Sequence, residues 1–245
     1  MHTFQNKDIC MALILNLETA TETCSVALAR NGETFLLKES AAGRNHASDL
    51  TLFISQILDE TDLGVSDLDA VAVSMGPGSY TGLRIGVSVA KGLCYGAGIP
   101  LLAVSTLQAM IYGLPEAEKS GADFLVPMLD ARRMEVYTAL FDSTATEIEP
   151  VSARIITQDS FSEWLDKGVV CFFGDGSSKC REYNSHPNAR FVDSFRNSAR
   201  HMTILSEEAF SNSEYRDVAY FEPFYLKDFI ATVPKNKVLG QLIPS

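Results

Sequence analysis

The sequence predicts an α/β fold built from two similar lobes. Short apolar runs that read as buried strands alternate with longer segments of helical periodicity. This alternation occurs twice, before and after a polar stretch at residues 115–123 (PEAEKSGAD). Alternating strands and helices favour sheets covered by helices. We therefore expect an N-terminal lobe at 1–114 and a C-terminal lobe at 115–245, whose tail packs back on the first lobe.

The first lobe is expected to open with three hairpin-connected strands. Apolar runs at 12–17 and 25–30 predict two of them, and Asn31-Gly32 is a typical hairpin turn before a third at 33–38. The link between the first two strands is polar and rich in hydroxyl groups. Met11, directly before the first strand, is a candidate for the start of translation.

Two long helices are predicted next. Asn45 is placed to cap a helix at 46–61, whose apolar residues form one stripe: Leu50, Phe53, Ile54, Ile57 and Leu58. A short strand at 68–75 leads through Gly-Pro-Gly into the second helix at 79–95. This helix has a small-residue ridge at every fourth position, made of Gly82, Gly86 and Ala90. Because an internal glycine costs about 1 kcal/mol relative to alanine, we expect close packing to offset the ridge.

The other elements are shorter. We predict a strand at 101–104 and a short helix that ends near Gly113. In the second lobe we expect strands at 124–129, 135–141, 154–156, 169–173 and 192–195. Helices are expected at 160–165, 177–184 and 198–211.

The composition excludes several classes of function. A net charge of −11 disfavours direct binding of a nucleic-acid backbone, although a basic partner could bring RNA to the chain. No apolar stretch reaches the ~18 residues of a membrane-spanning helix. The five cysteines lack metal-type spacing, which is typical of reduced thiols in a cytoplasmic protein.

Two segments are candidates for phosphate loops. Gly76 and Gly82 are one residue too far apart for GxxxxGK[ST], and the third glycine is one place late for GxGxxG. The polar link that holds Glu18, Thr19 and Thr21 lies where some nucleotide-binding folds hold phosphate near Mg²⁺. Such a loop normally contains glycine for close approach, and this one has none. A solvated turn is therefore favoured.

Four blocks of sequence together resemble the bacterial TsaB (YeaZ) family. They are LILNLETAT at 13–21, GPGSYTGLRIGVSVAKGL at 76–93, IPLLAVSTL at 99–107 and PMLDARRMEVYTALFD at 127–142. The resemblance implies the duplicated α/β fold of actin and Hsp70 (the ASKHA fold), with a mixed sheet flanked by helices in each lobe. It also implies a cytoplasmic, non-catalytic subunit of the complex that forms threonylcarbamoyladenosine in tRNA next to the anticodon.

The resemblance further implies partners. The paralogous transferase TsaD would hold the metal and perform the chemistry, the ATPase TsaE would join them, and tRNA would be met only through the complex. Alone, the chain would form a homodimer. Both helices of the first lobe would form the contact, with ten candidate residues: Leu50, Phe53, Ile54, Ile57, Gly82, Arg84, Gly86, Val87, Ala90 and Lys91.

Some alternatives stay open. The small-residue ridge could serve this contact or pack on its own sheet, in which case the exposed side would be that of Arg84, Ser88 and Lys91. Glu18, Thr19 and Thr21 would form a vestigial nucleotide loop, so weak binding of ADP or ATP stays open. No catalytic or metal residue is predicted, since position 50, where a partner of His46 would stand, is Leu50. The alternative function is an active ATPase or small-molecule kinase of the same fold.

Overall fold

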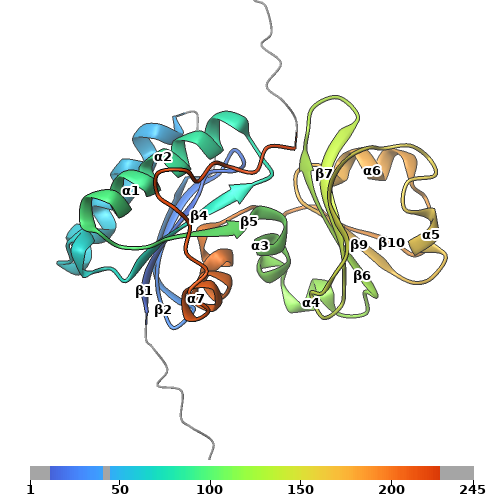
Figure 1. Ribbon diagram of the computed structural model, residues 1–245. Coiled ribbons are helices and arrows are strands. Elements are labelled where there is room, and N and C mark those ends of the chain that lie inside the picture. Colours follow the sequence, from blue (N-terminus) through green and yellow to red (C-terminus); the bar gives the residue numbers. More distant parts are fainter. Residues whose placement is uncertain (1–11, 41–44, 227–245) are drawn as a thin grey trace, which may run out of the picture.

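The computed structural model describes residues 12–40 and 45–226, which form two five-stranded mixed sheets (Figure 1). The first has the strand order β3-β2-β1-β4-β5, and the second has the order β10-β9-β6-β7-β8. Each sheet begins with two antiparallel hairpin pairs and continues with two parallel pairs. The two sheets therefore share one topology, as a duplication would produce. The expectations for Met11 and for the tail beyond residue 226 lie outside the described residues.

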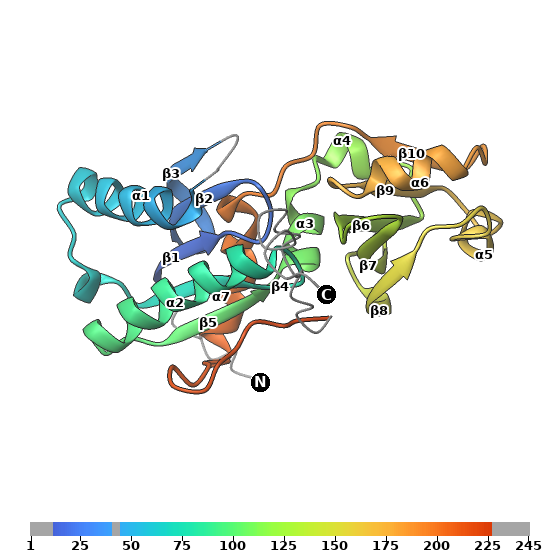
Figure 2. The same ribbon diagram turned by 90° about the horizontal axis from the view of Figure 1, so that it is seen from above.

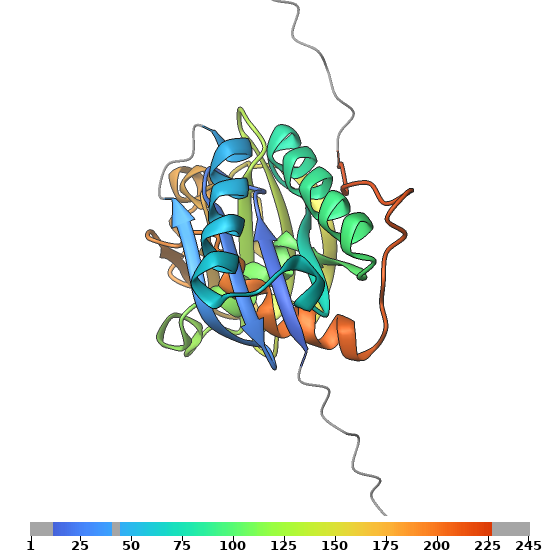
Figure 3. The same ribbon diagram turned by 90° about the vertical axis from the view of Figure 1, so that its left-hand side faces the viewer.

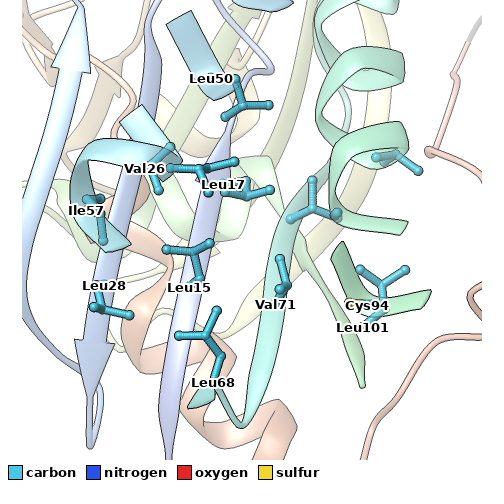
Figure 4. Close-up of a cluster of buried hydrophobic side chains, with 14 of the residues drawn as sticks. Leu15, Leu17, Val26, Leu28, Leu50, Ile57, Leu68, Val71, Cys94 and Leu101 are labelled. Carbon is cyan, nitrogen blue, oxygen red and sulfur yellow. The ribbon is translucent and has the colours of Figure 1, made fainter. Parts of the chain in front are cut away.

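The first sheet follows the predicted order. Its strands are β1 (Leu13–Glu18), β2 (Cys24–Arg30), β3 (Glu33–Ser40), β4 (Ala70–Gly76) and β5 (Leu101–Ser105). Successive side chains of β1 point to opposite faces. Leu15 and Leu17 join the hydrophobic cluster beneath the long helices, whereas Ile14 joins a cluster on the other face (Figure 4). Both faces are covered, which explains why all six residues of the strand are buried, the polar Asn16 and Glu18 included.

Helices α1 (His46–Thr61) and α2 (Tyr80–Ala97) lie side by side on one face of the first sheet (Figure 3). Both were predicted. Ser79 caps α2, because its hydroxyl accepts a hydrogen bond from the Gly82 amide at 3.3 Å. Gly98 ends the helix in the left-handed conformation, with φ at 70°.

The second sheet consists of β6 (Phe124–Asp130), β7 (Glu135–Asp142), β8 (Glu147–Ile155), β9 (Val170–Phe173) and β10 (Ala189–Val192). Helices α5 (Ser162–Leu165) and α6 (Ser177–Tyr183) cover one face, where Leu165 and Cys180 pack with Phe172. Helix α3 (Thr106–Gly113) covers the other face. It lies between the two sheets, with Met110 in the second-sheet core and Ala109 in a first-sheet cluster (Figure 2).

The chain returns to the first sheet at its end. The 3-10 turn η2 (Ala199–Met202) and helix α7 (Thr203–Ser211) pack on the face opposite α1 and α2. Residues 214–226, which we call the C-terminal strap, then run past β5 and α2 (Figure 3). The Arg216 amide donates to the Leu101 carbonyl at 2.8 Å, and the Phe224 amide donates to the Met75 carbonyl at 2.7 Å.

Several predicted elements differ from the structure. The strand expected at 154–156 is the end of β8, an edge strand too polar to be recognised in full. The strand expected at 192–195 lies earlier, at β10. The single turns η1 (Val65–Asp67) and α4 (Glu116–Lys119) were not predicted, because segments this short carry no helical periodicity.

Candidate functional site

The β1–β2 turn is buried, so the expectation of a solvated turn is wrong. Glu18 is 1% exposed and Thr19 is fully buried, while Thr21 is half-buried. The Thr19 hydroxyl donates to the Gly82 carbonyl of α2 at 2.8 Å. The turn is therefore covered by the N-terminal end of α2 rather than by water.

Glu18 makes internal hydrogen bonds. One of its carboxyl oxygens, Oε1, accepts from the Ala20 amide at 2.6 Å and from the Ser74 hydroxyl at 3.0 Å. Burial raises the pKa of the Glu18 carboxyl from 4.5 to about 7, although both hydrogen bonds lower it. This carboxyl is held inside the lobe by β1 and β4.

Three glycines explain how α2 comes so close. A Cβ built on Gly78 would overlap Ala20, one on Gly82 would overlap the Thr19 carbonyl, and one on Gly86 would overlap the Thr19 hydroxyl. The small-residue ridge therefore packs on the β1–β2 turn and on β4 of its own lobe. This resolves the alternative left open by the sequence.

The N-terminal end of α2 is also occupied by the chain itself. The Ser79 amide donates to the Ala20 carbonyl at 2.7 Å, and the Gly82 amide donates to the Ser79 hydroxyl. Free amide groups are what make a helix N-terminus bind phosphate. At the equivalent end of the second sheet, the Asp130 carboxylate pairs with Lys179 at 2.8 Å. Two amide groups at the start of α2, and the carboxylate at the matching end of the second sheet, are therefore already bonded within the chain.

Most of the predicted docking residues are buried within the first lobe, so only a few of them are accessible to a partner. Seven of the ten are buried in the first lobe: Leu50, Ile54, Ile57, Gly82, Gly86, Val87 and Ala90. They pack on the first sheet because they form the apolar inner sides of α1 and α2. Phe53 is half-buried and Arg84 is exposed, so these two remain on the outer surface.

Lys91, another of the predicted docking residues, contacts the C-terminal strap. Its ammonium group donates to the carbonyl oxygens of Ala219 and Phe221, at 3.0 and 3.1 Å. The side chain therefore holds the C-terminal strap against α2. Arg84 donates to the Tyr80 hydroxyl at 2.9 Å, and the Tyr80 ring lies 4.8 Å from the ring of Tyr225 in the same strap.

The outer surface of α1 and α2 exposes apolar and very small side chains. Leu52 of α1 is 53% exposed and Tyr95 of α2 is 85% exposed. Ser88, Gly92 and Gly96 follow one another at four-residue spacing on the exposed side of α2. Apart from the backbone of α2, no atom of the described chain lies within 4 Å of a Cβ built on Gly92 or Gly96.

We call the surface of Leu52, Phe53, Ser88, Gly92, Tyr95 and Gly96 the outer helical face. Of these six residues, only Phe53 was among the predicted docking residues. The signal was present in the sequence, since Ser88, Gly92 and Gly96 repeat every four residues one row away. The Gly82, Gly86 and Ala90 ridge packs on its own lobe, whereas nothing in the described chain packs on the row of Ser88, Gly92 and Gly96.

The described residues carry neither a metal-binding cluster nor a membrane-spanning helix. Among residues 12–40 and 45–226, no group of three or more His, Cys, Asp or Glu side chains could hold a metal ion. Cys24, Cys94, Cys171 and Cys180 are free and buried. Across the same residues, no helix combines the length and apolar character needed to cross a membrane.

Comparison with known proteins agrees with the resemblance seen in the sequence. Residues 39–235 match the family model of TsaD, tRNA N6-adenosine threonylcarbamoyltransferase. The chain is 41% identical over 124 residues to the tRNA threonylcarbamoyladenosine biosynthesis protein TsaB of Haemophilus influenzae, covering 51% of each. It is 34% identical to the Escherichia coli protein of that name, covering 64% of this chain and 71% of the relative. The chain thus spans about half the length of the first relative.

A solved structure shows the same architecture. YeaZ from Pseudomonas aeruginosa superposes with a TM-score of 0.73 at 28% identity, covering 88% of this chain and all of that one. The two duplicated sheets and their helices define a protein of the actin and Hsp70 structural class, as expected. Within that class, the chain belongs to the TsaB (YeaZ) family.

Proposed function

We propose that this chain is a non-catalytic subunit of the cytoplasmic complex that forms threonylcarbamoyladenosine in tRNA, and that it docks the transferase TsaD through the outer helical face. The relatives named as biosynthesis proteins support the pathway. The match to the TsaD family model supports a paralogous partner, because paralogues share helices that can pair with one another.

The observation that carries the docking role is Gly92 in the interior of α2. A glycine there destabilises an isolated helix by about 1 kcal/mol relative to alanine. Gly86 offsets its penalty by the close approach of Thr19, whereas Gly92 faces open space. A partner helix that packs closely on Ser88, Gly92 and Gly96 would supply the missing contact, and Leu52 and Tyr95 would be buried beside it.

The absence of chemistry in this subunit is proposed from the β1–β2 turn. Glu18 accepts hydrogen bonds from inside the lobe, and two amides at the start of α2 bond to the chain itself. An ATPase or kinase of this fold would need these groups for Mg²⁺ and phosphate. We therefore propose that catalysis and the metal belong to TsaD, that the ATPase TsaE joins the complex, and that tRNA is contacted through the complex. In the absence of TsaD, the same face would form a homodimer.

Reconstitution tests this function. The purified chain alone should hydrolyse no ATP and modify no tRNA. Adding it to TsaD, TsaE and the enzyme that makes the threonylcarbamoyl donor should restore threonylcarbamoyladenosine, measured by mass spectrometry of digested tRNA. ATP turnover by the chain alone, abolished by Glu18→Gln, would instead establish the alternative of an active ATPase or kinase. Modification that proceeds equally well without the chain would also reject the proposal.

A further inference from the structure

A cavity of about 470 Å³ lies between the two lobes, away from the outer helical face. Its walls come from the end of β3, the end of α3 and the segment that follows β10. The size falls in the ordinary range of small-molecule sites. None of the residues proposed for docking lines it.

Two opposite charges in this cavity lack ion pairs. Arg196 and Glu118 both line it, and neither has a salt bridge within the described part of the chain. The other charged pair in the wall is satisfied, because Glu39 pairs with Arg200 at 3.3 Å and accepts from the Ser198 hydroxyl at 2.8 Å. The Arg196 guanidinium and the Glu118 carboxylate are therefore free to form ion pairs with a ligand in the cavity.

Two further polar atoms of the wall are buried without a protein partner among the described residues. The Ser40 hydroxyl and the Nδ1 atom of His201 are buried without a hydrogen bond. Asn197, which is 6% exposed, adds a further polar side chain to the same wall. Buried polar groups are normally bonded, so this cluster indicates a missing polar ligand. Burial lowers the pKa of His201 to about 4, so the ring is neutral and can donate or accept.

The same cavity has an apolar side. Val192, Phe195 and Pro115 contribute to its wall, and the Phe195 ring packs on those of Phe173 and His201 at 5.1 and 5.5 Å. The ring of Phe195 is therefore held in place by neighbours. A ligand that fits this wall combines a large apolar group with both charges.

We propose that this cavity binds a free α-amino acid with a large apolar side chain. Arg196 takes the carboxylate, Glu118 takes the ammonium group, and Phe195 with Val192 receives the side chain. Ser40, Asn197 and His201 supply the remaining hydrogen bonds. This site is independent of the proposed docking of TsaD.

Calorimetric titration of the full chain tests the site with L-phenylalanine, N-acetyl-L-phenylalanine and L-phenylalaninamide as probes. The zwitterion should bind saturably, and each derivative, which lacks one charge, should bind about tenfold more weakly. Arg196→Ala should weaken the binding of L-phenylalanine without changing the binding of L-phenylalaninamide. Glu118→Gln should weaken the binding of L-phenylalanine without changing the binding of N-acetyl-L-phenylalanine. The matched controls Arg30→Ala and Glu33→Gln remove exposed charges outside the cavity, and should bind as the parent chain does.

Three results would overturn the proposal. The first is no saturable binding of L-phenylalanine by the parent chain at millimolar concentration. The second is equal affinity for all three probes, which would show that the site does not recognise the carboxylate and ammonium groups of the ligand. The third is that Arg30→Ala and Arg196→Ala weaken the binding of L-phenylalanine equally, in variants whose circular dichroism is unchanged. The effect of Arg196→Ala would then come from the change in net charge alone.

Discussion

The side-chain hydroxyl of Thr19 donates a 2.8 Å hydrogen bond to the main-chain carbonyl of Gly82. This bond joins the β1–β2 turn to the N-terminal end of α2. Its consequence is that the first lobe is closed on itself at this end. The opposite side of α2, with Ser88, Gly92 and Gly96, is the side exposed to solvent.

Thr19→Val should destabilise the fold by about 1–2 kcal/mol, because it removes a buried hydrogen bond while keeping the volume of the side chain. Urea unfolding followed by circular dichroism measures this. Thr19→Ser keeps the hydroxyl and serves as the control, with a smaller loss from its missing methyl group. Equal stability of Thr19→Val and the parent chain would contradict the role given to this bond.

Glu18→Gln should stabilise the protein above neutral pH. The folded-state pKa is raised from 4.5 to about 7, so the folded state binds the proton more tightly than the unfolded state. Stability therefore falls as pH rises from 4.5 to 7, by about 3 kcal/mol at most for this group. Glutamine keeps an acceptor for Ala20 and Ser74 without the charge. Urea unfolding should show that the variant has a larger free energy of unfolding than the parent chain at pH 8 but not at pH 4.5. The same difference in free energy of unfolding at both pH values would refute the assignment.

Gly92→Ala and Gly86→Ala should have opposite effects. At Gly92 the added Cβ meets open space, so stability should rise by about 0.5–1 kcal/mol through helix propensity. At Gly86 the Cβ would overlap the Thr19 hydroxyl, so stability should fall. Thermal unfolding of the two variants measures the contrast. If both changes shifted the midpoint in the same direction, the packing described for α2 would be wrong.

Lys91→Met should loosen the C-terminal strap. The change removes the donor to the Ala219 and Phe221 carbonyls while leaving the aliphatic stem. Tyr220 is 85% exposed, so chymotrypsin should cleave after it several-fold faster in the variant, as mass spectrometry would record. Arg30→Ala, which removes a charge far from the strap, should be cleaved at the parent rate. An unchanged rate for Lys91→Met would mean that other contacts hold the strap.

The sequence predicted the fold better than the site, for physical reasons. Hydrophobic periodicity located α1 and α2, because burial of one helix face leaves a repeating pattern. The same pattern cannot tell a glycine that approaches its own β1–β2 turn from one that faces a partner. Gly86 and Gly92 are alike in sequence and differ only in what lies opposite. Thr19 was misjudged for a related reason, since a polar turn becomes buried only when a distant helix covers it.

The affinity of purified TsaD for this chain tests the central claim most directly. Isothermal titration calorimetry should compare the parent chain with Gly92→Trp and with Ser178→Trp, which places the same bulk on exposed α6 of the second lobe. If the outer helical face docks TsaD, Gly92→Trp should weaken binding by about tenfold or more, because an indole would separate the two helices. Ser178→Trp should bind as the parent chain does. Full affinity of a correctly folded Gly92→Trp variant would contradict the account.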